Sequence, residues 1–232
     1  MNVRDLDAHT ALPDAAPRVT SPATLGQAWK TFFRFPSPLI MASLAVSGIA
    51  TKLWFGDWSR WDLVVVLGLL LAWPVQEWLI HVFILHFEPK KLGRFTIDPY
   101  TSQKHRRHHR DPWRIELVFI PARVLPFTTP LLVLLWFGLS PTHGIAATGL
   151  MAYFCLAFHY EWVHYLVHTR YKPRSWYYQR LWRSHRLHHF MNEHYWYGVS
   201  MLAGDRLLRT SPDPKSVEPS PTCRTLGKMD EV

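Results

Sequence analysis

The chain has little cysteine. Only Cys155 and Cys223 occur among its 232 residues, one in an apolar run and one in a polar segment. They form no CxxC pair, which excludes a thiol redox motif and the spacing of a zinc ribbon, and two cysteines do not make a disulfide framework. No apolar segment precedes Pro36, so we expect no signal peptide.

Motifs of electron-carrying proteins are also missing. The sequence has no glycine-rich dinucleotide fingerprint, no four-cysteine set for an iron–sulfur cluster and no haem-ligand motif apart from the histidine clusters described below. Nothing in it resembles a flavin or nicotinamide site.

Long apolar runs are abundant instead. Hydrophobic residues make up 48% of the chain, and they are concentrated in four runs, at about Pro38–Phe55, Leu63–Leu85, Val118–Leu139 and Gly144–Val167. A bilayer core takes about 20 helical residues, so each run is long enough to span it or nearly so. Pro121, Pro126 and Pro130 should distort the third run, and Lys52 in the first can snorkel. Four soluble core helices of this kind in one short chain would be unusual.

The net charge of +9 has two explanations, nucleic-acid binding or membrane topology. The connection between the second and third runs is strongly basic, whereas the first connection holds only Arg60 and the third, Ser140–His143, holds no lysine or arginine. By the positive-inside rule, the termini and the long connection are expected on the cytoplasmic side. The charge therefore follows membrane topology, and we expect no nucleic-acid partner. The basic residues of the long connection are Lys90, Lys91, Arg94, Lys104, Arg106, Arg107, Arg110 and Arg114.

Histidine is also abundant in this sequence. Of 14 histidines, ten fall into four clusters, HxxxxH, HxxHH, HxxxH and HxxHH, all on the predicted cytoplasmic side. On a helix, positions i, i+3 and i+4 lie within roughly a 100° arc, so one HxxHH can direct three imidazoles to one centre. HxxxxH spreads its rings further, so it needs a π-bulge, a helix end or two different metal ions. The ten are His81, His86, His105, His108, His109, His164, His168, His185, His188 and His189.

Ten neutral nitrogen ligands are too many for one ion, whereas two ions with about five each would use them and leave positions for oxygen or water. A structural zinc would take four ligands and no open position. At a membrane surface this indicates redox chemistry on a lipid-soluble substrate and favours iron at both positions, with zinc as a substitute in purified protein. Glu77, Glu161, Asn192 and His194 are candidates to orient the ligands; for the two glutamates, a simple helix-end charge explains the sequence equally well.

The motif order and its surroundings resemble the fatty acid hydroxylase / sterol desaturase superfamily. The resemblance rests on "EWLIHVFILHFEP", "HRRHHRDPWRIELVFIP", "YEWVHYLVHTRYKP" and "LWRSHRLHHFMNEHYWYGVSMLAGDRLLRT", and it covers about Trp73–Thr210. It implies an all-α integral membrane domain of about four transmembrane helices with a cytosolic histidine-rich helical cap. It also implies two irons held by the ten histidines, O₂ as oxidant and a lipid substrate.

We therefore expect a membrane hydroxylase of a lipid C–H bond, with a fatty acyl chain as first choice and a sterol- or carotenoid-like lipid next. A desaturase with the same site is the near alternative, and a membrane metal-binding or transport protein the distant one. Electrons should come from a separate ferredoxin or cytochrome b5-type donor with its reductase. Basic residues expected to attract an acidic donor are Lys90, Lys91, Arg106, Arg107, Arg180, Arg183 and Arg186.

Three regions are expected: a polar tail at 1–35 with an interfacial helix near Ala23–Arg34, a membrane-embedded hydroxylase-like domain at 36–210, and a disordered tail at 211–232.

Overall fold

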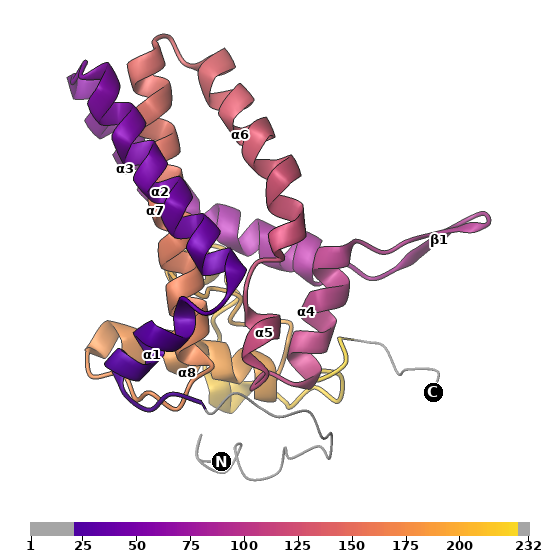
Figure 1. The fold of residues 1–232 in the computed structure, drawn as a ribbon. Coiled ribbons are helices and arrows are strands. Elements are labelled where there is room, and N and C mark those ends of the chain that lie inside the picture. Colours follow the sequence, from indigo (N-terminus) through magenta and orange to yellow (C-terminus); the bar gives the residue numbers. More distant parts are fainter. Residues whose placement is uncertain (1–20, 227–232) are drawn as a thin grey trace.

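The computed structural model describes residues 21–226, and these are mostly helical, as predicted (Figure 1). The expected polar tail lies largely outside the described residues. The elements are α1 (Leu25–Phe32), α2 (Pro36–Phe55), α3 (Arg60–Ile80), the π-helix η1 (His81–Leu85), β1 (Lys90–Leu92), β2 (Phe95–Ile97), α4 (Tyr100–Arg110), α5 (Ile115–Val118), η2 (Ala122–Val124), α6 (Leu125–Leu139), α7 (His143–Val167), α8 (Trp176–Phe190), α9 (Ala203–Leu207) and η3 (Pro214–Ser216).

Four long helices form the bundle, and α7 contacts each of the other three, α2, α3 and α6. Among the described residues, three segments are long and apolar enough to cross a membrane: Pro36–Phe55, Arg60–Leu85 and Ile115–Leu139. The predicted count of four spans is therefore approximate. The 25-residue α7 is not one of these three segments; it is the central helix, and its small and polar residues, such as Ala146, Thr148 and Glu161, are buried against its neighbours.

The third apolar segment is broken, as its prolines predict. Pro121 precedes the short helix η2, Pro126 lies in the first turn of α6, and Pro130 lies inside α6. Each proline lacks a backbone N–H, so the segment cannot continue as one regular helix. In Figure 1, α6 lies close to α7 at the loop that joins them and diverges from it toward the cap.

The cap lies at one end of the bundle and contains α1, α4, α5, α8 and α9 (Figure 1). The helix expected near Ala23–Arg34 is present as α1, with Thr24 as its N-cap. Its Phe32 is fully buried against Tyr165, whose hydroxyl donates to the Ala28 carbonyl at 3.0 Å. These contacts fix α1 against the end of α7.

The C-terminal segment departs from the sequence-based expectation of disorder. Residues 211–226, which we call the C-terminal strap, are described and pack against the cap. Ser220 N donates to the Met191 carbonyl at 2.7 Å, and the Arg224 guanidinium donates to the carbonyls of His109 and Arg110. The composition is rich in proline and serine, but hydrogen bonds to the backbone of α4 and to the end of α8 hold the strap in place.

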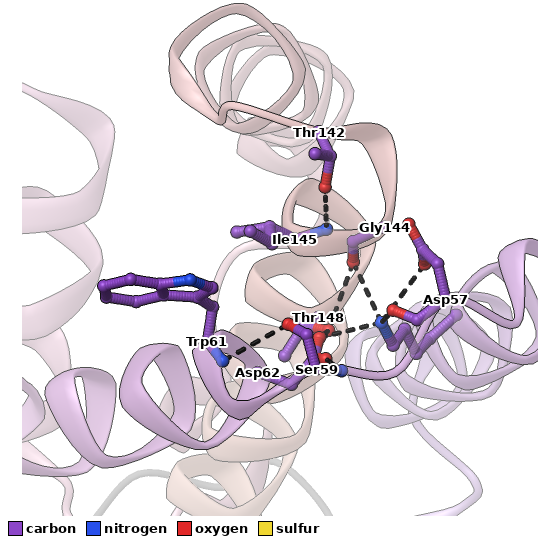
Figure 2. Close-up of polar contacts among 9 residues, drawn as sticks. Asp57, Ser59, Trp61, Asp62, Thr142, Gly144, Ile145 and Thr148 are labelled. Carbon is purple, nitrogen blue, oxygen red and sulfur yellow. Dashed lines mark hydrogen bonds and ion pairs between the residues drawn. The ribbon is translucent and has the colours of Figure 1, made fainter.

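A buried charge cluster closes the other end of the bundle (Figure 2). The Lys52 ammonium does not snorkel outward. It is 0% exposed and contacts Asp62 Oδ1 at 2.7 Å and the Asp57 carbonyl at 3.0 Å. Asp62 also accepts from the Thr148 hydroxyl on α7. A Cβ at Gly144 would clash with the Asp57 carboxylate, so a larger residue there would displace the Asp57 side chain from the cluster. The cluster joins the α2–α3 connection to the start of α7.

Replacing Lys52 with methionine should destabilise the protein by about 3–5 kcal/mol, because Asp62 would stay buried without its cation. Thermal unfolding in detergent micelles measures the loss. The Lys52→Met/Asp62→Asn double variant should recover part of it, and Arg60→Met, at an exposed position on the same connection, should have almost no effect. A double variant no more stable than Lys52→Met would contradict the pairing.

Candidate metal centre

The π-helix η1 brings two histidines of the first cluster to the same side. His86 N donates to the His81 carbonyl at 3.0 Å, which is a bond across five residues. The extra residue in the turn offsets the wide angular spacing of HxxxxH on an α-helix. Of the three solutions that this spacing allows, the chain uses the π-bulge.

The other clusters lie on α4, at the C-terminal end of α7 and on α8. The structure brings all ten predicted histidines together in two groups of five, and within each group one ligand atom per residue lies within 4.8 Å of the others. The first group contains His81, His86, His105, His109 and His188. The second contains His108, His164, His168, His185 and His189.

Each HxxHH divides between the two groups. On α4, the i,i+4 pair His105 and His109 belongs to the first group and His108 to the second. On α8, the i,i+4 pair His185 and His189 belongs to the second group and His188 to the first. Positions i and i+4 differ by only about 40° around a helix, whereas position i+3 lies on the other side of i, about 60° from i and about 100° from i+4. The groups are adjacent, since the ring centroids of His109 and His189 are 4.2 Å apart.

Backbone carbonyls orient the rings of the first group. The Nδ1 atoms of His81, His109 and His188 donate to the carbonyls of Tyr197, Cys223 and Tyr195 at 2.7, 2.8 and 2.8 Å. A carbonyl only accepts, so the proton of each neutral ring is on Nδ1 and the lone pair is on Nε2.

The lone pairs face one another inside the site. His105 Nε2 lies 3.2 Å from both His81 Nε2 and His109 Nε2. The Nε2 atoms of His86 and His188 are buried and have no hydrogen-bond partner among the described residues. Buried acceptors without donors are unfavourable, and a metal cation would satisfy all five at once. The first group therefore fits a metal ion.

The second group has the same character. The rings of His164 and His168 donate to the carbonyls of Val118 and Pro112. His185 Nε2 lies 2.8 Å from His168 Nε2 and 3.0 Å from His189 Nε2. His164 Nε2 is buried without a hydrogen-bond partner in the described chain. This group also fits a metal ion.

Burial keeps the cap histidines neutral. It lowers the pKa of His109 to about 3, although a hydrogen bond from the ring to the Cys223 carbonyl opposes the shift. Burial first, and neighbouring histidines second, lower the pKa of the other cap histidines well below the ordinary value. Neutral imidazole is the form that binds metal, so the apoprotein has the ligands ready near neutral pH. The histidines with this shift are His105, His108, His168, His185, His188 and His189.

The four predicted orienting residues do not contact the histidine rings as expected. Glu77 accepts from the backbone N–H groups of Val199 and Ser200 and from the Ser200 hydroxyl. Glu161 accepts from the Ser37 hydroxyl at 2.6 Å and from Ile120 N at 2.8 Å.

Asn192 and His194 lie beside the strap and not in the histidine site. The Asn192 amide donates to the Glu218 carbonyl at 3.1 Å and accepts from His194 N. The His194 side chain is 70% exposed. Among the described residues, neither side chain forms a hydrogen bond to one of the ten clustered histidines, so the prediction that they orient the ligands is corrected.

Sequence reasoning also missed the loop that supplies two of the orienting carbonyls. Trp196 lies between Tyr195 and Tyr197 and has a φ of 57°, in the left-handed region that a tryptophan rarely adopts. Asp205 holds this conformation by accepting from Tyr197 N at 2.9 Å and Gly198 N at 2.7 Å. Glu77 accepts hydrogen bonds from the backbone of the next two residues, Val199 and Ser200. It therefore helps to orient the His81 ring through the loop and not by direct contact.

A cavity of about 310 Å³ lies between the bundle and the histidines. Its lining is mainly apolar and includes Trp73, Leu125 and Ala157, and it reaches His105 of the first group and His164 of the second. Lys104 also lines it, and its ammonium donates to the Phe119 carbonyl at 2.6 Å. Burial lowers the pKa of Lys104 to about 8, so this side chain is still mostly protonated at neutral pH.

Comparisons with known proteins agree with this geometry. The sequence model described as fatty acid hydroxylase matches residues 66–210, more than half of the chain. The chain is 27% identical over 154 residues to a dihydroceramide fatty acyl 2-hydroxylase of Arabidopsis thaliana, covering 66% of this chain and 62% of the relative. It is 28% identical over 157 residues to the fatty acid 2-hydroxylase of Rattus norvegicus, covering 65% and 41%. The chain thus spans less than two thirds of either relative.

The fold resembles a solved structure of full-length Scs7p in which only the hydroxylase domain is visible. The TM-score is 0.61 at 20% identity, and the match covers 87% of this chain and 71% of the other. At this identity the likeness concerns the fold alone, and it includes most of the bundle and cap. The match to the family model carries the assignment: this chain belongs to the fatty acid hydroxylase family.

Proposed function

We propose that this protein hydroxylates a C–H bond of a fatty acyl lipid, using O₂ and two iron ions. The observation that carries the proposal is the pair of five-histidine groups beside an apolar cavity. The names of the relatives, which are fatty acyl and fatty acid 2-hydroxylases, support an acyl substrate and oxidation close to its carbonyl end.

The donor chemistry favours iron at both groups. Imidazole suits iron, zinc, copper and nickel, and five nitrogens at each group differ from the closed four-ligand set of structural zinc. The ten histidines of the two groups would hold the ions. Bound iron would supply reductive activation of O₂, in which two electrons and two protons are consumed, one oxygen atom enters the C–H bond and the other leaves as water.

The protein's own residues prepare the site for this chemistry. The carbonyls of Tyr195, Tyr197 and Cys223 fix three rings with their lone pairs directed inward. The apolar cavity wall excludes water and would hold a hydrocarbon chain against His105 and His164. The same oxidant can remove two hydrogen atoms from the acyl chain. Hydroxylation and desaturation are therefore distinguished by the product and not by the metal ligands.

Metal transport is less compatible with the arrangement. A transporter binds its ion near the membrane midplane, within broken helices. Here η1, α4 and α8 carry most of the histidines at one end of the bundle. We place this end and both termini on the cytoplasmic side, following the excess of lysine and arginine in the α3–α4 connection.

A separate donor should supply the electrons. Not all seven basic residues expected to attract it are available: Arg106 pairs with Asp98 at 2.7 Å, and the buried Arg186 lies over the Trp182 ring at 4.1 Å. The other five, Lys90, Lys91, Arg107, Arg180 and Arg183, are exposed, and the three arginines lie on the cap helices α4 and α8, where they form the basic surface for an acidic ferredoxin or cytochrome b5.

The function is tested with full-length protein prepared without oxygen and loaded with ferrous iron. We expect about two irons per chain and formation of a hydroxylated fatty acyl product when a donor, its reductase and O₂ are supplied. His188→Ala should weaken the first site and His108→Ala the second, and each should abolish turnover. His194→Ala, at an exposed ring, is the matched control and should do neither. Full iron content and turnover in His188→Ala would refute the assignment, and an alkene product would identify a desaturase.

The C-terminal strap should be needed for tight iron binding, because it supplies the carbonyl that orients His109. Deleting residues 211–232 should weaken iron affinity by about 10–100-fold, measured by titration with a competing chelator. Deletion of 227–232 is the control. Arg224→Ala, which removes the bonds to the His109 and Arg110 carbonyls, should give a smaller loss with unchanged circular dichroism. Wild-type iron affinity in the 211–232 deletion would show that the strap has no such role.

We further propose that Lys104 positions the acyl substrate. Its ammonium borders the apolar cavity one residue before His105, where it could bind the carboxylate or carbonyl of the substrate and hold the adjacent carbon near the metal groups. Lys104→Met should raise the KM and scatter the hydroxylation position, with unchanged iron content, whereas Lys104→Arg should largely preserve both. Mass spectrometry of the products is the measurement, and a single unchanged product position in Lys104→Met would exclude this role.

A further inference from the structure

A two-stranded hairpin projects from the cap between η1 and α4 (Figure 1). Its strands β1 and β2 pair antiparallel, with Lys90 opposite Ile97 and Leu92 opposite Phe95. Gly93 in the turn has a φ of 59°, which favours glycine. Every residue from Lys90 to Ile97 is exposed, and such an isolated hairpin is marginally stable at best in water.

The hairpin has two chemically different faces. Directly paired residues share a face, and so do alternate residues of one strand. Leu92, Phe95 and Ile97 therefore lie on one face with Lys90, and they are 68%, 63% and 46% exposed. Lys91 and Thr96 occupy the opposite face. An exposed apolar face of this kind marks an interaction site.

We propose that this face binds the surface of an anionic bilayer. The hairpin begins five residues after the end of the apolar segment Arg60–Leu85, so it emerges close to the membrane boundary. The end of this segment also has exposed apolar side chains, since Phe83 and Ile84 are 61% and 46% exposed.

The charges on the hairpin complement anionic headgroups. Lys90, Lys91 and Arg94 are exposed, and no acidic residue lies between Lys90 and Ile97. Arg94 lies over the Phe95 ring at 5.0 Å from its centroid, so an apolar ring and a cation are presented together. Basic residues at a membrane surface attract anionic lipid, while adjacent aromatic and aliphatic side chains enter the boundary of the acyl region.

This contact would also position the cavity. Leu85, five residues before the hairpin, and Thr101, four residues after it, both line the cavity. A hairpin bound to the membrane surface holds both segments at the depth from which a lipid chain is taken up.

The test uses the strict alternation of the strand. An environment-sensitive fluorophore is attached at Phe95→Cys or, as the matched control, at Thr96→Cys, in full-length protein carrying Cys155→Ala and Cys223→Ser. The protein is placed in nanodiscs of phosphatidylcholine with a minority of phosphatidylserine, one chain per disc. We expect the label at 95 to be blue-shifted and quenched by a nitroxide on the lipid chains, and the label at 96 to be quenched by aqueous iodide.

Three outcomes would overturn the proposal. Equal iodide quenching at both positions would show that the apolar face is in water. Protection at 95 only in discs that hold two chains would show that a second copy covers it. Equal protection without phosphatidylserine would remove the role of anionic headgroups. None of these readouts depends on iron or on turnover, so they are independent of the proposed hydroxylase activity.

Discussion

Ten imidazole rings packed into one end of a helical bundle create the constraint on which the rest of the structure depends. Burial holds the cap rings in the neutral form, and carbonyls fix the tautomer of several of them so that their lone pairs point inward. Without a cation, these acceptors face one another with no donor. Metal binding would relieve this cost only in the folded state, so metal affinity and folding stability should be linked.

The burial of the rings also explains why neutral backbone carbonyls, and not carboxylates, orient the histidines. A carboxylate beside each ring would add charge to a site that already removes ten polar rings from water, and buried charge is costly unless it is paired. The carboxylates Glu77 and Asp205 instead bind backbone N–H groups of the loop after α8. They stabilise the left-handed conformation at Trp196 from outside the site, and the loop carries the orientation to His81 and His188.

The sequence was sufficient to predict the helical membrane fold and the gathering of the ten histidines. The lysine and arginine asymmetry places all four clusters on one side of the membrane, and the spacing within each cluster follows from helical periodicity, which is a local property. The spacing of His81 and His86 was also enough to predict that they need a π-bulge, a helix end or two different ions. How each HxxHH divides between two groups was not predictable, since it depends on the angle between α4 and α8. The carbonyl groups that orient the rings belong to the backbone, so side-chain identity gives no sign of them. The strap has a composition that usually indicates disorder, and its order became evident only from the hydrogen bonds of Ser220 and Arg224.

The broken third segment connects these features to the cavity. Three prolines prevent residues 115–139 from forming one straight helix, and the irregular stretch between α5 and α6 has free backbone groups as a result. Ile120 N donates to Glu161, and the Val118 carbonyl accepts from His164, so both groups are used by α7. Phe119, Val124 and Leu125 from the same stretch line the cavity. A continuous helix would satisfy its own backbone bonds and could not supply these contacts. The prolines that weaken the span therefore provide both the orientation of a histidine and the apolar cavity beside it.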